Sequence, residues 1–379
     1  MSRLPFWGAP VEPSRARIAG LRAPFQSMAR LPLELPDLPR ALRELIAQVP
    51  AGRVTTCGWL ARALGNPVAA RWVGHFTLHD ELARHCPSHR VVRAGGQLGG
   101  LIDADERAKI RRLAEEGVEI RAGVVDLDRF GFDGFRSERP LEQLRHVQER
   151  LVARVAIRTR RRLPRLVGGV DVAYPGGTRA VAAYALVERE SGELVYSKTV
   201  PGRATFPYIT TYLAFRELPV LLALLQEVRA ARRLAEVLLV DGSGRLHPRQ
   251  AGIATHLGVM AGVPTVGVTK KLLCGQVDVE GMRPGESRPI VDEDRPVGAA
   301  LRPSAGSRRP IFISPGHRVD LPFAERLVGE LLRGRRLPEP LYQADRLSRV
   351  AARETEDGAT ARRAPRRTPL GAEEGDGVL

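Results

Sequence analysis

The sequence has 379 residues, a length typical of two or three domains. Its hydrophobic content of 43% is sufficient for buried cores and excludes a chain that is disordered throughout. Lysine and arginine number 59 against 43 acidic residues, which gives a net charge of +16. This excess favours a polyanionic partner such as nucleic acid, although a drift towards arginine-rich composition would produce the same number.

The three cysteines are Cys57, Cys86 and Cys274. They form no CxxC pair, so the sequence supports neither a zinc knuckle nor a disulfide framework, and a reduced, cytoplasmic setting is expected. No apolar run approaches the length of a membrane span, and the first residues lack the apolar core of a secretion signal.

The first third of the chain predicts a small helical module. Residues 1–35 are rich in proline and arginine and are expected to form a flexible leader. The segment ALRELIAQVP has apolar residues at helical spacing and ends at Pro50. A second short helix is expected after Thr55 or Thr56, and a third from Pro67, joined by a tight Gly-Asn-Pro turn. We therefore expect an α-rich, winged helix-turn-helix-like module over residues 36–130.

Residues 131–165 form a basic linker. Its first part, LEQLRHVQERLVARV, predicts a connecting helix. Five arginines then follow almost together: Arg158, Arg160, Arg161, Arg162 and Arg165. Contacts with phosphates and a simple solvated charge run are equally open interpretations of this cluster.

The pattern changes to short apolar runs over residues 166–348. RLVGGVDVAY, AVAAYALVE and LVYSKTV predict three strands, a helix is expected over about 212–228, and AEVLLVDG predicts a buried strand. A helix from Pro248 to about Met260 leads into the strand PTVGVT. This order predicts an α/β domain with a mixed sheet and helices on its faces. The charged, glycine-rich residues 349–379 are expected to be a disordered tail.

Two carboxylates interrupt the predicted buried strands. Asp171 lies within RLVGGVDVAY, and Asp241 ends EVLLVDG. A buried carboxylate is costly unless something pairs with it, and strand ends are where sites are usually built. Oxygen ligands without nearby cysteine favour Mg²⁺ or Mn²⁺ over Zn²⁺. Two strand-end aspartates taken alone are as well explained by caps or turns.

The segment DGSGRLHPRQAGIATHLG favours a functional site over that alternative. Gly242 and Gly244 allow the backbone to pass close to a ligand. His247 follows on the same loop, where it can serve as an acid or base near neutral pH. A helix opened by Pro248 would present an N-terminus that favours an anion.

These residues carry a resemblance to endonuclease V, the family that nicks nucleic acid beside deoxyinosine. The matching stretches cover about residues 165–348 in family order: GGVDVAY, FPYITTYLAFRE, VDGSGRLHPRQAGIATHLG, VPTVGVTKKLLCG, FISPGHRVDL and LPEPLYQADRLS. The resemblance implies a ribonuclease-H-like fold in which Asp171, Glu217 and Asp241 gather around Mg²⁺, with Mn²⁺ as the alternative. It further implies a cut at the second phosphodiester 3′ to the lesion.

The resemblance assigns three more side chains to the active site and two elements to the lesion. His247, Lys270 and His317 match family active-site positions. FPYIT resembles the wedge that parts the strands, with Tyr208 stacking in the gap, although Thr210-Thr211 stands where the family has Pro-Gly.

The extruded base is expected in a pocket walled by backbone near Leu213, Gly242 and Ile253. Flipping costs least at a mispaired base, which is itself a source of selectivity.

The stretch from AGRVTTCGWLARALGNPVAARWVGHF to the motif PSHRV, followed by EEGVEI, is similar to the DNA-binding domain of alkylguanine-DNA alkyltransferases. That family acts through a cysteine in Pro-Cys-His-Arg-Val, where this chain has Ser88 before His89. A neutral hydroxyl is a much poorer nucleophile than a thiolate, so the chain resembles the alkyltransferase-like proteins, which bind alkylated guanine without repairing it. Cys86 is interpreted as a buried structural cysteine, with rescue of the reaction as the alternative.

Three other positions of this module correspond to family residues. Arg71 matches the finger arginine that fills the gap left by a flipped base, and Glu116 matches a partner of the motif histidine. The family's tyrosine that helps to rotate the nucleotide falls at Cys57.

The interpretation that combines both resemblances is a DNA repair endonuclease tethered to duplex DNA by a non-transferring module. Two alternatives stay open. A non-catalytic lesion-binding or signalling protein would not need three acids facing a phosphate. An endoribonuclease specific for inosine would use the same nuclease residues, although a helix-turn-helix-like module favours duplex DNA.

Overall fold

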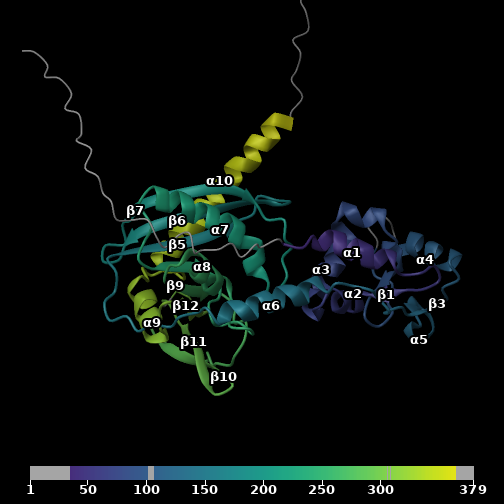
Figure 1. Ribbon diagram of the computed structural model, residues 1–379, viewed down its shortest axis with the longest axis horizontal. Coiled ribbons are helices and arrows are strands. Elements are labelled where there is room, and N and C mark those ends of the chain that lie inside the picture. Colours follow the sequence, from purple (N-terminus) through teal and green to yellow (C-terminus); the bar gives the residue numbers. More distant parts are fainter. Residues whose placement is uncertain (1–34, 101–105, 305, 308, 364–379) are drawn as a thin grey trace, which may run out of the picture. The chain divides into compact units, whose positions relative to one another are not determined.

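The computed structural model describes residues 35–100, 106–304, 306–307 and 309–363 (Figure 1). The expected leader up to residue 34 and the end of the expected tail lie outside the described residues. Among the described residues, no helix combines the length and the apolar character that a membrane crossing requires.

The N-terminal region is helical, as expected. The side chain of Thr56 accepts a hydrogen bond from the backbone N–H of Trp59 and caps α2, and the Asn66 side chain caps the turn that runs into α3. Apolar residues such as Val54, Leu98 and Leu113 form its core. Its helices are α1 (Leu38–Ala47), α2 (Cys57–Ala63), α3 (Ala70–His79), α4 (Glu106–Glu115) and α5 (Leu127–Phe130), with 3₁₀ turns at Pro67–Ala69, Glu81–His85 and Ser88–Arg90. Its short strands are β1 (Thr55–Thr56), β2 (Val91–Val92), β3 (Ile120–Arg121) and β4 (Val124–Val125).

The basic linker contains the expected helix, α6 (Pro140–Val152). The chain beyond it has no regular structure until β5. Arg326 donates hydrogen bonds to the backbone carbonyls of Arg160 and Arg161, at 3.3 and 2.9 Å, so part of the arginine run is fixed by its backbone.

The C-terminal region is built on one mixed sheet of eight strands in the order β10-β11-β12-β9-β8-β5-β6-β7 (Figure 1). Strands β5, β8 and β9 are parallel to one another, and the other pairs are antiparallel. The strands are β5 (Leu166–Ala173), β6 (Arg179–Glu188), β7 (Leu194–Arg203), β8 (Leu238–Asp241), β9 (Thr265–Thr269), β10 (Ser287–Asp292), β11 (Arg295–Leu301) and β12 (Ile311–His317). The mixed sheet expected from the apolar runs is therefore confirmed.

Helices cover the sheet on both faces, and alternate residues of each central strand supply two separate cores. Leu238 and Val240 of β8 join one core with α7 (Leu213–Ala230) and α8 (Ile253–Ala261). Leu239 between them joins a second core with α9 (Leu321–Glu330) and the first turn of α10 (Glu339–Arg363). The two-residue period of a strand requires this alternation, and burial on both sides explains why the strand reads as a continuous apolar run.

Three local expectations are corrected. Helix α8 begins at Ile253 rather than at Pro248, because Gln250 takes a positive φ of 51° and Gly252 is extended. Pro315 lies inside β12, where it occupies a bulge, and does not form a turn before His317. Helix α10 continues to Arg363, through residues expected to belong to the disordered tail.

Candidate active site

The parallel pairing of β5 with β8 places two acids side by side. Val170 is in register with Val240, so the next residues, Asp171 and Asp241, lie at the same end of neighbouring strands. This relationship follows from the sheet alone, because both carboxylates lie at or near the carboxyl ends of parallel strands.

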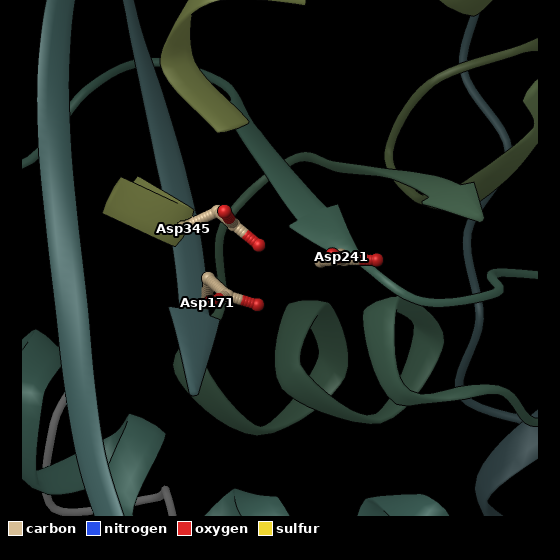
Figure 2. Close-up of side chains that lie close together, drawn as sticks. All are labelled: Asp171, Asp241 and Asp345. Carbon is tan, nitrogen blue, oxygen red and sulfur yellow. The ribbon is translucent and has the colours of Figure 1, made fainter. Parts of the chain in front are cut away.

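A third carboxylate comes from α10. Asp345 joins Asp171 and Asp241 in a cluster in which one oxygen of each lies within 4.8 Å of the others (Figure 2). The close approach of α10 depends on Gly169, since a Cβ there would lie 2.2 Å from the carbonyl oxygen of Pro340. Figure 2 shows the three side chains pointing toward one another from two strands and a helix.

Polar and cationic side chains surround the cluster. Ser348, one turn beyond Asp345, donates a hydrogen bond of 2.7 Å to Oδ2 of Asp171. Lys270 Nζ lies 3.0 Å from Oδ2 of Asp241 and 3.9 Å from Oδ1 of Asp345. Arg349 Nη2 lies 2.9 Å from Oδ1 of Asp345. Without these cations, three carboxylates this close would repel one another strongly.

Glu217 lies in the first turns of α7 and is 8% exposed, near the cluster but not among the three acids whose oxygens converge. Its Oε1 accepts a hydrogen bond of 2.8 Å from the hydroxyl of Tyr174. Burial raises the pKa of Glu217 to about 8, and the charges of Asp171 and Asp241 add to that effect. Burial, followed by the charge of Asp241, also raises the pKa of Asp171 to about 6, while the Ser348 hydroxyl opposes the rise.

The cluster fits a divalent metal ion on its own chemistry. The ligand atoms are carboxylate oxygens, as hard cations require, and their mutual spacing allows one ion to contact all three. The raised pKa values of Asp171 and Glu217 mark negative charge that the surroundings do not fully stabilise, which a dication would relieve. Asp171, Asp241 and Asp345 are the residues that would hold it.

A cavity of about 460 Å³ opens beside the cluster. Acids form part of its lining, and two arginines one turn apart on α10, Arg349 and Arg353, form another part. The complete lining is Asp171, Val172, Ala173, Tyr174, Pro175, Asp241, Lys270, Asp345, Arg349, Ala352 and Arg353. A site with acids and cations side by side suits a phosphodiester, whose phosphate needs both a metal and positive side chains.

The two expected histidines have their ring nitrogens in contact with backbone groups outside the acidic cluster. His317 pairs with Thr265 at the opposite end of β9 from Lys270, and its Nδ1 accepts a hydrogen bond of 3.3 Å from the backbone N–H of Ala156. Burial and the nearby Arg318 lower the pKa of His317 to about 4. His247 is 3% exposed, and its Nε2 lies 3.0 Å from the carbonyl oxygen of Thr211.

The residues expected at the lesion lie around the start of α7 and the loop after β8. Tyr208 is 64% exposed between the buried Phe206 and Ile209. Gly242, at a φ of 148°, packs so closely against Ile253 that a Cβ would lie 2.3 Å from the Ile253 side chain. Leu213 is the first residue of α7.

The other glycine of that loop serves a different purpose from the one expected. A Cβ on Gly244 would lie 2.2 Å from the carbonyl oxygen of Pro315, so this glycine allows the loop to cross β12. Close approach to a ligand is therefore not needed to explain it.

In the N-terminal module, Ser88 is buried at the start of a 3₁₀ turn and His89 Nε2 lies 2.8 Å from Oε1 of Glu116. The Arg90 guanidinium contacts the same carboxylate, and these partners outweigh burial and hold the pKa of Glu116 at about 2. Burial raises the pKa of the Cys86 thiol to about 11. Arg71 is exposed on the first turn of α3.

The sequence reasoning missed Asp345 and Ser348. Both lie in LPEPLYQADRLS, a stretch recognised as similar to the family but given no role. The available signal was their spacing of three residues, which places both on one face when the stretch is helical, as it is in α10.

The acidic cluster and its cationic rim on a mixed sheet fit a phosphodiester-cleaving enzyme that would hold a metal ion there. A family model for endonuclease V matches residues 149–346, and one for the DNA-binding domain of 6-O-methylguanine DNA methyltransferase matches residues 37–118. The chain belongs to the endonuclease V family and is a nuclease, with an alkyltransferase-like DNA-binding domain preceding the nuclease domain. Both resemblances inferred from the sequence are thereby confirmed.

Individual relatives agree. A bifunctional methyltransferase/endonuclease of Picrophilus torridus is 34% identical over 286 residues, which cover 75% of this chain and 87% of that protein. Endonuclease V of Ignicoccus hospitalis is 41% identical over 187 residues, 49% of this chain and 82% of that protein. The crystal structure of the catalytic domain of human Endonuclease V matches with 36% identity and a TM-score of 0.54, over 58% of this chain and 98% of that chain.

A further solved structure contains nucleic acid. It is Endonuclease V of Ciona intestinalis in complex with a 24mer DNA containing an inosine followed by a ribo-adenosine. It matches with 28% identity and a TM-score of 0.51, over 57% of this chain and 99% of that chain.

Proposed function

We propose that the protein is a DNA repair endonuclease that hydrolyses a phosphodiester on the 3′ side of deoxyinosine, with Mg²⁺ or Mn²⁺ held by Asp171, Asp241 and Asp345. The observation that carries the proposal is the convergence of these three carboxylates beside Lys270 and Arg349 in an endonuclease V domain. The finer description of the domain as ribonuclease-H-like, and of the module as a winged helix-turn-helix, belongs to the same proposal.

The side chains around the cluster have distinct roles in this proposal. Asp171, oriented by Ser348, and Asp241 would hold the cation from the sheet. Glu217 is a further acid within electrostatic reach, able to release its proton as positive charge arrives. When bound, the divalent cation supplies Lewis acidity toward the phosphate and makes water a better nucleophile. Lys270 would exchange its ion pair with Asp241 for a contact with the phosphate.

The arginines of α10 extend this phosphate site. Arg349 and Arg353 line the cavity next to the acids, so a backbone lying there would meet two guanidinium groups on one side. A guanidinium group can donate two hydrogen bonds to one phosphate, and such contacts fix the register of the nucleic-acid strand.

The lesion-side residues support recognition of an extruded base. Tyr208 is exposed between two buried anchors, as a stacking wedge must be. Leu213, Gly242 and Ile253 are proposed to wall the base pocket. The relative from Ciona intestinalis was solved with DNA containing inosine, which supports the same lesion for this chain.

The N-terminal module is proposed to bind duplex DNA through α3, with the Arg71 side chain entering the base stack of the DNA. Binding in this way would hold the nuclease domain on its substrate. Alkyl transfer is not part of the proposed function. Ser88 offers no thiol, and Cys86 is mostly protonated near neutral pH because of its raised pKa. The buried Ser88 and the pair of His89 with Glu116 would form the floor of a lesion-binding pocket.

The decisive experiment uses a labelled duplex containing one deoxyinosine, incubated with the protein or with Asp241→Ala in the presence of Mg²⁺, Mn²⁺ or chelator. A metal-dependent nick on the 3′ side of the lesion, absent with the variant, is expected. A matched substrate with inosine in RNA separates the endoribonuclease alternative. Binding of the lesion without any nick would establish the non-catalytic alternative and overturn the proposal.

A further inference from the structure

Thr211, three residues after Tyr208, has an unfavourable backbone conformation. Its φ is +68°, in the left-handed region that glycine occupies readily and a β-branched residue avoids. A residue held there costs free energy and persists only when its surroundings fix it. The contacts of Thr211 therefore need an explanation.

Three side chains donate hydrogen bonds to the carbonyl oxygen of Thr211. They are Gln148 Nε2 at 3.0 Å, His247 Nε2 at 3.0 Å and Arg249 Nη2 at 2.9 Å. Arg249 Nη2 also donates to the Thr211 hydroxyl at 2.8 Å. One residue thus receives four hydrogen bonds from α6 and from the loop after β8.

The three donors are themselves fixed. Arg249 Nε donates to Oε1 of Gln148 at 2.7 Å, and its guanidinium lies 4.8 Å from the ring centroid of Tyr212. Gln148 is fully buried. The Nδ1 atom of His247 accepts from the backbone N–H groups of Arg249 and Ala251, at 3.1 and 3.4 Å. Since Nδ1 accepts, Nε2 carries the proton and is the donor to Thr211.

We propose that Gln148, His247 and Arg249 are positioning residues that clamp Thr211 and thereby hold the wedge Tyr208 in place. The proposal rests on the proposed function, in which Tyr208 enters the base stack. It assigns His247 a role as a hydrogen-bond donor to the wedge loop, in place of the acid-base role expected from the sequence. Both ring nitrogens are occupied, so no free nitrogen remains to exchange a proton with substrate.

The clamp explains how this chain accommodates Thr210-Thr211 where the family it resembles has Pro-Gly. Proline and glycine stiffen and shape such a turn through the backbone itself, whereas here side chains from two other segments impose the shape. A wedge that is already ordered avoids the entropy cost of ordering during binding, so more of the binding free energy is available to part the strands.

The first test measures how well the wedge loop is ordered in the protein without DNA. Chymotrypsin cleaves after Tyr208 but not after Phe206, because proline follows the latter. We expect Arg249→Met to raise the rate of cleavage at Tyr208 about tenfold, since local opening exposes the loop to protease. Arg245→Met is the matched control, because Arg245 lies on the same loop but donates to Gln250. An equal rate in the wild type and in Arg249→Met would overturn the clamp.

The second test measures how far the DNA strands open at the lesion. A duplex with 2-aminopurine beside deoxyinosine is mixed with each protein and Ca²⁺, and the fluorescence rise reports unstacking. We expect Arg249→Met to reduce the rise, and the single-turnover nicking rate with Mg²⁺, by about tenfold, with little change in affinity for undamaged duplex. In a Thr211→Gly background the same substitution should cost only about threefold, because glycine adopts the positive φ without help.

The two roles of His247 are separated by the pH profile. If His247 positions the loop, His247→Asn lowers the nicking rate equally across the pH range, and Thr211→Gly recovers part of the loss. Loss of one limb of the profile without recovery would instead make His247 a proton carrier and remove it from the clamp. Additive losses for Arg249→Met and Thr211→Gly would also contradict the proposal. Absence of any nick by the wild type would refute the proposed function only, because the proteolysis result stands without substrate.

Discussion

The hydroxyl of Ser348 donates a hydrogen bond of 2.7 Å to Oδ2 of Asp171, joining α10 to the first strand of the nuclease domain. Asp345 lies one turn earlier on the same helix and brings its carboxylate to the same place. One face of α10 thus supplies both a carboxylate for the cluster and the group that orients Asp171. The C-terminal helix is therefore an integral part of the candidate active site.

Ser348→Ala is expected to lower nicking about tenfold, because a hydrogen bond to a charged group is worth about 1.5–3 kcal/mol. The hydroxyl favours the ionised form of Asp171, so its loss raises the pKa of that carboxyl further. The acid limb of the pH–rate profile should therefore move to higher pH. Thr355→Ala, on the same helix with its hydroxyl bonded to the Ala351 carbonyl, is the control. An unchanged profile in Ser348→Ala would show that the hydrogen bond does not tune Asp171.

Asp345→Asn removes one negative charge from the cluster without changing its shape. We expect nicking to fall about 100-fold, since a lost carboxylate ligand weakens metal binding and metal-dependent chemistry together. Isothermal titration with Mn²⁺ should show weaker binding, while melting in chelator should be unchanged or slightly higher because repulsion is reduced. Arg346→Ala, an exposed neighbour outside the cavity lining, is the control. Full metal affinity in Asp345→Asn would exclude this residue as a ligand.

The sequence was sufficient to find the two acids that strand pairing alone brings together. Asp171 and Asp241 each lie at or near the carboxyl end of an apolar run, and parallel neighbours place such ends side by side. The position of Asp345 depends on how α10 crosses the sheet, which in turn depends on the absence of a side chain at Gly169. Helix packing of this kind is a tertiary property that periodicity does not encode.

The position of His317 differs from the expected one for a related reason. Its motif Ser-Pro-Gly-His suggests a turn, but the bulged strand β12 continues through Pro315 and runs antiparallel to β9. An antiparallel strand carries its last residue to the far end of the sheet, away from Lys270. The bulged strand therefore places His317 at the other end of β9 from Lys270.

Glu217→Gln tests the electrostatic state of the metal-free site. Folding raises the pKa of Glu217 from 4.5 to about 8, so the folded protein binds more protons than the unfolded chain between these values. The free energy of unfolding of the wild type should therefore fall, by on the order of a few kcal/mol, as pH rises from about 5 to about 8 in chelator. The glutamine variant should lose most of this slope, and Asp171 would account for the remainder.

Mg²⁺ should also reduce the slope of the wild-type free energy of unfolding against pH, because the cation favours the ionised carboxylates. Urea titrations at several pH values, with and without Mg²⁺, measure both effects. Parallel slopes for the wild type and the variant in chelator would show that Glu217 is ionised in the folded protein throughout this range.

Gly169→Ala tests whether the approach of α10 builds the site. The added methyl would lie 2.2 Å from the Pro340 carbonyl oxygen, so α10 must shift or the strand must distort. We expect a lower melting temperature, with a loss of about 1–3 kcal/mol, and a larger loss of nicking. Gly329→Ala is the matched control, because that helical glycine has no heavy atom near its missing Cβ and alanine favours helices. Equal melting temperatures and nicking rates of the two variants would show that the added methyl group fits between β5 and α10.

Mass spectrometry of the N-terminal module tests whether it transfers alkyl groups. After incubation with a duplex containing O6-methylguanine, the wild type should gain no methyl group at Ser88 or Cys86, because the first lacks a thiol and burial raises the pKa of the second to about 11. Ser88→Cys places a thiol beside His89, whose ring is paired with Glu116, and a measurable gain of one methyl group is expected there. Methylation of Cys86 in the wild type would show instead that the module transfers alkyl groups through a neighbouring thiol. The absence of transfer in Ser88→Cys would locate the block at nucleotide rotation, where Cys57 replaces the family's tyrosine.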